Sequence, residues 1–241
     1  MAPRILRRRL VSIVLAGVSS ALSLLAQSGD TDSSSRRRRM VEQDIAARGV
    51  TDNRVLAALR KIPRERFVPP EMASRAYEDR PLPIGFGQTI SQPYIVARMT
   101  EALLEGGPLL NVLELGTGCG YQTAVIAPLV GKIYSIERIE PLLQRAKQRL
   151  KELDIRNVRF RHGDGSLGWK AHAPYDGILV AAAPLQVPEA LLQQLTIGGR
   201  LIVPIGPEGE QELFRFTRHE QKVEKKSLGG VAFVPLLGGT A

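Results

Sequence analysis

The sequence predicts an α/β protein built on a doubly wound, mostly parallel sheet. In the second half of the 241-residue chain, short apolar runs alternate with segments of helical period, which is the pattern of strands and crossover helices in such a sheet. A glycine-rich turn, Gly116-x-Gly118-x-Gly120, follows the first of these strands, where such folds place a ligand. We also expect a small N-terminal helical extension and an antiparallel hairpin at the sheet edge.

Residues 1–39 have the layout of a secretory signal followed by a flexible, arginine-rich linker. Residues 1–26 combine a basic start with an apolar run, and residues 27–35 are polar. The apolar run is short for a membrane span, which needs roughly 20 residues. The segment therefore predicts export or membrane tethering. A true start at Met40 is the alternative, because Met40 opens a clean helix.

Residues 40–241 are predicted to form one domain, since about 200 residues bury a substantial core. We expect residues 40–108 to form a cap of helices and loops and residues 109–241 to form the sheet with its helices. Thr51 or Asp52 is the expected N-cap of the second helix. The cap is expected to hold helices at 40–49, 54–60 and 91–104, and loops at 62–70 and 77–87.

The sheet region is predicted to begin with five strands, each followed by a helix or a loop. A sixth and a seventh strand, 212–219 and 226–234, follow without a helix between them, and strands joined in this way pair antiparallel. The first five strands are expected at 109–115, 132–137, 158–162, 177–180 and 200–205, with helices at 121–130, 141–153 and 188–195.

Composition and charge exclude several classes of function. The single cysteine, Cys119, excludes an intramolecular disulfide framework and most cysteine metal sites, and the three histidines show no metal-ligand spacing. The net charge is +9, but residues 1–39 hold eight arginines and two aspartates, so only +3 belongs to the rest. That near balance gives no electrostatic case for nucleic acid. We expect the run Arg36–Arg39 to be a solvated linker end.

The spacing of the glycines indicates which ligand the turn binds. The third glycine comes two positions after the second, whereas the dinucleotide fingerprint places it three positions after. The spacing resembles motif I of class I S-adenosylmethionine methyltransferases, E/D-x-G-x-G-x-G, with Glu114 as the acid. Glu137 ends the second strand about twenty residues further on, where a carboxylate accepts hydrogen bonds from ribose hydroxyls. The alternative for Glu137 is a solvated carboxylate at a helix start.

Further motifs on both sides of the turn carry a more specific resemblance. They are Gly87-Gln88-Thr89-Ile90-Ser91-Gln92-Pro93, Gly118-Cys119-Gly120-Tyr121-Gln122-Thr123-Ala124, Arg161-His162-Gly163-Asp164-Gly165 and Phe233-Val234-Pro235-Leu236. From about Met40 to its C-terminus, the chain resembles the protein-L-isoaspartate O-methyltransferase family, which repairs isomerised aspartyl residues. The resemblance implies S-adenosyl-L-methionine as cofactor and isoaspartyl-containing proteins and peptides as partners.

The resemblance also implies roles for individual residues. Ser91 matches the active-site serine and, with Gln88 and Thr89, closes over the methyl donor and the substrate carboxylate. Glu137 binds the ribose. The other expected cofactor-binding residues are Glu114, Gly116, Thr117, Gly118, Gly120 and Arg138, together with Asp164 and Gly165 beside the adenine.

These residue types suit methyl transfer to a carboxylate. The free α-carboxylate of an isoaspartyl linkage needs no general base, because its reference pKa of about 3.5 leaves it ionised at neutral pH. The enzyme has to hold it in line with the methyl group, and such positioning contributes about 7–11 kcal/mol at best. Hydroxyl and amide donors suit that task. Alternatively, Ser91 is a simple N-cap that contributes about 1 kcal/mol to helix stability.

Two positions depart from the family pattern, and two other functions stay open. Cys119 stands where the family usually has serine, and Ala181 where it usually has threonine. The alternatives are a methyltransferase for another acceptor and a non-catalytic S-adenosylmethionine-binding module. The fourth predicted strand is followed by Ala182-Ala183-Pro184, which lacks the Asn/Asp-Pro-Pro-aromatic motif of amino methyltransferases and argues against a nitrogen acceptor.

For the molecule as a whole, the resemblance implies a cytoplasmic enzyme, which we expect to be a monomer without a nucleic acid partner. The signal-like segment makes a periplasmic or membrane-tethered form the alternative. That alternative conflicts with the expected cofactor, because the cell makes S-adenosylmethionine in the cytoplasm.

Overall fold

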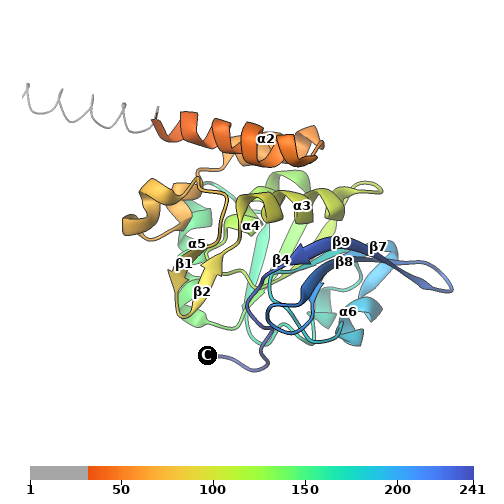
Figure 1. The fold of residues 1–241 in the computed structure, drawn as a ribbon. Helices are drawn as coiled ribbons and strands as arrows, with labels where there is room; N and C mark the ends of the chain where they lie inside the picture. Colours follow the sequence, from red (N-terminus) through yellow and green to blue (C-terminus); the bar gives the residue numbers. More distant parts are fainter. Residues whose placement is uncertain (1–31) are drawn as a thin grey trace, which may run out of the picture.

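The computed structural model describes residues 32–241, which form a central sheet covered by helices (Figure 1). The signal-like segment predicted for residues 1–26 lies outside the described residues. Within the described part of the chain, no helix is long and apolar enough to cross a membrane.

A sheet of seven strands runs through the described residues in the order β5-β4-β3-β6-β7-β8-β9. Neighbouring strands from β5 to β7 pair in parallel, and β8 and β9 add an antiparallel hairpin at one edge. The predicted fold class is therefore confirmed. The strands are β3 (Asn111–Leu115), β4 (Lys132–Glu137), β5 (Val158–His162), β6 (Tyr175–Val180), β7 (Leu195–Ile205), β8 (Gln211–Arg218) and β9 (Val223–Val231).

Helices pack on both faces of this sheet, as a doubly wound fold requires. On one face, buried side chains of α3, α4 and α5, among them Val125 and Leu142, join a cluster with Val112 of β3. On the other face, Leu191 of α6 packs in a second cluster with Ile178 of β6. The helices are α2 (Asn53–Lys61), α3 (Pro93–Leu104), α4 (Tyr121–Ile126), α5 (Glu140–Glu152) and α6 (Glu189–Gln193).

A small hairpin replaces part of the loop predicted for residues 77–87. β1 (Leu82–Gly85) pairs antiparallel with β2 (Gln88–Ile90). The sequence pattern did not predict these strands, because they contain Pro83 and the glycines of the turn, and both residue types are depleted in strands. The hairpin matters for function because β2 carries part of the expected active-site loop.

Residues 32–39 are helical, so the prediction of a flexible linker up to residue 39 is wrong for this part of the chain. The Arg37 Nε donates to the carbonyl of Arg60 at 2.7 Å, and the Arg36 guanidinium donates to the carbonyl of Ser74 at 2.8 Å. Half of the arginine run is therefore docked on the cap and is not a solvated linker end.

Other differences from the predicted elements concern their ends. The helix predicted at 121–130 ends at Ile126, because Pro128 lies in a 3₁₀ turn that follows. β7 begins at Leu195, five residues earlier than predicted, and the glycines at 198 and 199 explain why periodicity did not reveal it. Short helical turns in the described residues are a π-helical turn at Met40–Ile45 and 3₁₀ turns at Ala46–Arg48, Arg64–Phe67, Pro70–Arg75, Ala127–Leu129 and Lys170–His172.

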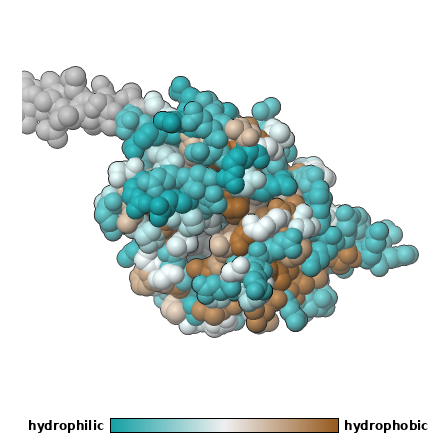
Figure 2. Space-filling model, in the orientation of Figure 1, coloured by the Kyte–Doolittle hydropathy of each residue, from teal (hydrophilic) through white to brown (hydrophobic). Residues whose placement is uncertain are grey.

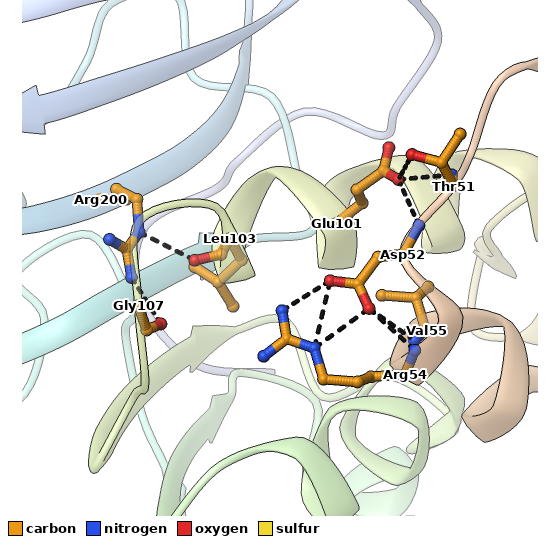
Figure 3. A network of polar contacts seen from close by, with 8 residues as sticks. All are labelled: Thr51, Asp52, Arg54, Val55, Glu101, Leu103, Gly107 and Arg200. Atoms are coloured by element: carbon orange, nitrogen blue, oxygen red, sulfur yellow. Dashed lines mark hydrogen bonds and ion pairs between the residues drawn. The ribbon is translucent and has the colours of Figure 1, made fainter.

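A polar network anchors α3 to the rest of the cap and to the sheet (Figure 3). The Glu101 carboxylate of α3 accepts the backbone N–H groups of Thr51 and Asp52 at 2.7 and 2.9 Å. Asp52 in turn accepts two backbone N–H groups of the first turn of α2 at 2.8 and 3.4 Å, which confirms it as the N-cap. Arg200 of β7 donates to the carbonyl of Leu103 at 2.9 Å, near the C-terminal end of α3. The position of α3 is therefore fixed from two sides.

Candidate functional site

A cavity that is partly open to solvent lies at the carboxyl ends of β3, β4 and β6. Its wall is formed by the β1–β2 hairpin, the glycine turn after β3, and residues 234–237 near the C-terminus. Figure 2 shows a hollow near the middle of this face of the molecule, with hydrophobic side chains gathered beside it. The predicted site residues that line the cavity are Gln88, Thr89, Ser91, Gly116, Thr117, Gly118, Glu137, Arg138 and Gly165.

The glycine turn has a backbone conformation that explains its composition. Gly116, Gly118 and Gly120 have φ values of 88°, 53° and 89°, a region that residues with a Cβ rarely adopt. A Cβ at Gly116 would lie 3.4 Å from the Cβ of Ala181, which follows the neighbouring strand β6. Gly120 does not line the cavity. A Cβ there would lie 3.2 Å from the Cβ of Ala146, so Gly120 allows α4 and α5 to pack closely.

Glu137 and the glycine turn are joined by a hydrogen bond. The Glu137 Oε2 accepts the Gly118 backbone N–H at 2.8 Å, and Oε1 accepts the Ile139 backbone N–H at 2.9 Å. The side chain is 5% exposed and lines the cavity. A carboxylate has about four acceptor sites, so Glu137 keeps acceptors for a pair of hydroxyls. This donor and acceptor pattern fits the ribose of S-adenosylmethionine.

Glu114 lies outside the cavity and supports the turn from within the sheet. It is fully buried, and its Oε2 accepts hydrogen bonds from the hydroxyls of Thr123 and Ser135 at 2.6 Å each. The Ser135 hydroxyl also lies 2.6 Å from that of Thr117, which lines the cavity. Burial raises the pKa of Glu114 to about 7. Glu114 therefore reaches the cavity through two hydroxyl groups and not directly.

Asp164 also lies just outside the cavity, whereas Gly165 lines it. The Asp164 carboxylate accepts the backbone N–H groups of Ser166 and Gly239, both at 2.8 Å. These bonds, that from Gly239 above all, hold the pKa of Asp164 below its usual value. A Cβ at Gly165 would lie 3.1 Å from Cδ2 of Leu115, so this stretch of cavity wall packs closely on β3.

Ser91 lies on the short segment between β2 and α3, half-buried at the cavity. Gln92 occupies the N-cap position of α3 without a side-chain cap. Instead, Asp79 accepts the Tyr94 backbone N–H at 2.9 Å and a hydrogen bond from the Gln92 side chain at 2.7 Å. Because Asp79 performs the capping, the Ser91 hydroxyl is available to a ligand.

The two departures from the family pattern both lie in the cavity wall. Cys119 is 4% exposed, and burial raises the pKa of its thiol. Ala181 is half-buried beside Gly116. Neither residue closes the cavity, and neither removes a hydrogen bond that the turn makes with Glu137.

The C-terminal segment is a part of the site to which the sequence analysis assigned no role. Ala183, just beyond β6, exchanges backbone hydrogen bonds of 2.8 Å with Val234 and Leu236. Further along, the Ala241 backbone N–H donates to the carbonyl of Arg138 at 2.8 Å. The signal in the sequence that could have revealed this role is the Phe-Val-Pro-Leu motif at residues 233–236, because it is one of the motifs that resemble the family.

Comparisons with known proteins identify the family of the chain. Residues 35–241 match a family model described as protein-L-isoaspartate(D-aspartate) O-methyltransferase (PCMT). The chain is 55% identical over 206 residues to the protein-L-isoaspartate O-methyltransferase of Halorhodospira halophila, which covers 86% of this chain and 94% of that relative. It is 53% identical over 211 residues to protein-L-isoaspartate O-methyltransferase 1 of Nitrosococcus oceani, with 87% and 99% covered.

Solved structures of similar proteins share the fold. A protein-L-isoaspartate O-methyltransferase matches with a TM-score of 0.74 and 32% identity, over 83% of this chain and 66% of that one. A putative protein-L-isoaspartate O-methyltransferase of Plasmodium falciparum matches with a TM-score of 0.70 and 25% identity, over 83% and 98%. The latter structure is a complex with S-adenosyl-L-homocysteine.

Proposed function

The chain belongs to the protein-L-isoaspartate(D-aspartate) O-methyltransferase family, and we propose that the cavity between the β1–β2 hairpin and the glycine turn is its active site. The enzyme transfers a methyl group from S-adenosylmethionine to the free α-carboxylate of L-isoaspartyl residues in damaged proteins and peptides. The following backbone nitrogen then attacks the methyl ester, methanol leaves and a succinimide forms, whose hydrolysis returns part of the residue to normal aspartate.

One observation carries the assignment of the site. A single cavity is lined by the Gln88–Ser91 segment on one side and by Gly118 and Glu137, joined by their 2.8 Å hydrogen bond, on the other. We assign the second side to the cofactor, because its backbone turn and buried carboxylate suit a ribose and a flexible chain. The first side then faces the donor with hydroxyl and amide groups, which suits the substrate carboxylate.

The chemistry asks for positioning and not for an acid or a base. When bound, S-adenosylmethionine supplies a methyl group on a sulfonium, which a carboxylate attacks directly. Ser91 and Thr89 donate hydrogen bonds to the substrate carboxylate and hold one of its oxygens in line with that methyl group. Gln88 completes the donor set. The segment around Leu236, which lines the cavity, keeps bulk water from the reacting atoms.

A methylation assay of the full chain with labelled S-adenosylmethionine and two peptides tests this function. The peptides are identical except that one has an isoaspartyl linkage and the other a normal aspartyl linkage. We expect base-labile label on the isoaspartyl peptide alone, because the normal peptide presents no free α-carboxylate at that position. Label on neither peptide, with cofactor binding intact, would contradict the proposed active site.

We propose that the enzyme acts as a monomer in the cytoplasm, where S-adenosylmethionine is made. A fusion tests the compartment: residues 1–39 are joined to a reporter enzyme that is active only after export. An inactive reporter supports the cytoplasm, and an active one supports the periplasmic or membrane-tethered form.

A further inference from the structure

We propose that Phe86 is a specificity-determining residue, whose ring receives an apolar side chain adjacent to the isoaspartyl residue of the substrate polypeptide. This inference rests on the proposed active site, and it adds the chemistry of the residues that flank the damaged one. It starts from the tip of the β1–β2 hairpin, where backbone conformation, exposure and position all single out the same residue.

The backbone at this tip is unusual for the residue that it carries. Gly85, Phe86 and Gly87 have φ values of 92°, 54° and 68°, three consecutive residues in the left-handed region. Asp154 is the other residue besides glycine with positive φ in the described chain, and aspartate tolerates this conformation whereas a bulky side chain does not. Strained residues of this kind concentrate at ligand-binding sites.

Phe86 lies beside the cavity at the tip of the hairpin, without itself lining it. Phe86 lies between Ile84 and Gln88, which both line the cavity, and its carbonyl accepts a hydrogen bond from the Gln88 side chain at 3.4 Å. The Arg145 guanidinium stands 5.4 Å from the centre of the ring. The residue is nevertheless 50% exposed. The ring is thus supported by a charged side chain while half of the residue stays open to solvent.

Another exposed apolar side chain lines the cavity itself. Leu237 lines it from the C-terminal segment and is also 50% exposed. The hydrophobic side chains gathered beside the hollow in Figure 2 are consistent with a mouth that has apolar edges. Large apolar groups exposed at a binding site indicate contact with a partner.

The substrate polypeptide is the partner that this mouth must meet. Ser91 follows the hairpin directly, so a chain that places its isoaspartyl carboxylate at Ser91 brings its neighbouring residues to the tip. An apolar neighbour would bury surface against Phe86. Such neighbours are packed away in native proteins, so the preference would direct the enzyme to polypeptides whose damaged segment is unfolded.

Peptide kinetics test the proposal with matched variants. Phe86→Asn removes the ring and keeps a residue that tolerates positive φ, Phe86→Tyr keeps the ring, and Leu110→Ala removes an apolar side chain that is 70% exposed just before β3, at the end opposite the cavity. The substrates are isoaspartyl peptides with glycine or leucine before the damaged residue, and a second pair varied after it.

For one of the two pairs, we expect the wild-type kcat/KM to be about five- to tenfold higher with leucine than with glycine, since half-burying such a side chain is worth that much. Phe86→Asn should reduce this ratio to about one and leave the glycine peptide and the KM for S-adenosylmethionine unchanged. Phe86→Tyr and Leu110→Ala should keep the wild-type ratio.

Two outcomes would overturn the proposal. An equal loss on all peptides in Phe86→Asn would show that the ring only supports the hairpin. An unchanged ratio would show that the ring does not contact the substrate. Failure of the wild type to methylate any of the isoaspartyl peptides would instead contradict the proposed active site itself, so the two failures are distinguishable.

Discussion

At the scale of single residues, the structure separates two roles that the sequence left open for Ser91. A serine just before a helix is either its cap or a ligand-binding group, and sequence alone does not decide between them. Asp79 supplies the capping acceptor for α3, fifteen residues before the Tyr94 N–H that it accepts. No periodicity or motif links Asp79 to α3, because the contact depends on how the chain folds back. The Ser91 hydroxyl is thereby free of a capping role, and its role in catalysis stays a prediction.

Ser91→Ala should therefore reduce activity without reducing stability. A hydrogen bond to a charged group is worth about 1.5–3 kcal/mol, so we expect kcat/KM for an isoaspartyl peptide to fall about ten- to hundredfold. Thermal unfolding should be nearly unchanged. Asp79→Ala is the matched control, and losing a cap should lower its stability by about 1 kcal/mol. A destabilised Ser91→Ala with unchanged kinetics would restore Ser91 to a capping role.

Glu114 should make stability depend on pH in an unusual direction. Its pKa is about 7 in the folded protein against an ordinary 4.5. Between these values the folded protein keeps a proton that the unfolded chain has lost, so the free energy of unfolding falls as pH rises. Each pKa unit corresponds to about 1.4 kcal/mol, which makes the total decrease about 3 kcal/mol at most.

Urea unfolding of the wild type and Glu114→Gln between pH 4.5 and 8 measures this contribution. As pH rises through this range, the free energy of unfolding of the wild type should fall relative to that of Glu114→Gln. Glu71→Gln, at an exposed glutamate, serves as the control and should follow the wild type. Parallel pH curves for the wild type and Glu114→Gln would show that burial does not hold a proton on Glu114.

Cys119 should be an unreactive cysteine despite its place in the cavity wall. It is buried and its pKa is raised, and the thiolate is the reactive form. A thiol reagent should therefore label the folded protein at least tenfold more slowly than the urea-unfolded protein. Cys119→Ser, which restores the usual family residue, should keep methyl transfer within about threefold. Rapid labelling of the folded protein would contradict this, and the single cysteine makes the readout unambiguous.

At the scale of elements, the sequence predicted those parts whose pattern is local. The five parallel strands are short apolar runs in a fixed alternation with helices, so they were found with ends shifted by a few residues. The β1–β2 hairpin was missed because Pro83 and its glycines resemble a loop. The helix at 32–39 was missed because its arginines look solvated, and only the folded cap shows the carbonyl groups that they reach.

Arg37→Ala should destabilise the protein, whereas Arg38→Ala should not. The Arg37 guanidinium donates to the Arg60 carbonyl and, at 3.1 Å, to the Tyr77 hydroxyl, while Arg38 is exposed. Loss of these bonds should lower the free energy of unfolding by about 1–3 kcal/mol. Chemical unfolding of both variants measures the difference. Equal effects of the two substitutions would mean that residues 32–39 do not dock in solution.

At the scale of the whole molecule, the sequence identified the site through motifs but not how distant segments close it. The glycine turn and Glu137 were predictable because strand order brings their ends together. The sequence did not predict that Gly165 lines the cavity while Asp164 lies just outside it. Asp164 is held by the Gly239 backbone, and a contact between residues 75 positions apart leaves no local pattern.

The C-terminal segment links the ends of three strands, and this predicts a role in retaining the cofactor. It bonds to Ala183 after β6, to Asp164 after β5 and to Arg138 after β4. Removing residues 238–241 deletes the last two of these contacts and keeps the first. It also deletes the hydrogen bonds that the Glu140 backbone N–H donates to the Ala241 carbonyl and the Arg138 Nε donates to the Gly239 carbonyl. Each hydrogen bond contributes about 0.5–1.5 kcal/mol, so together they are worth at least about tenfold in affinity.

We therefore expect S-adenosyl-L-homocysteine to dissociate about tenfold faster from the protein lacking residues 238–241, as measured by stopped-flow displacement. The KM for S-adenosylmethionine should rise in parallel. Thr240→Ala, which keeps the backbone of the segment, is the control and should behave as the wild type. Equal dissociation rates in all three proteins would mean that the segment packs on the strand ends without holding the ligand. A faster rate in the truncated protein alone would show that closure of the site depends on contacts between the C-terminal segment and the ends of β4 and β5.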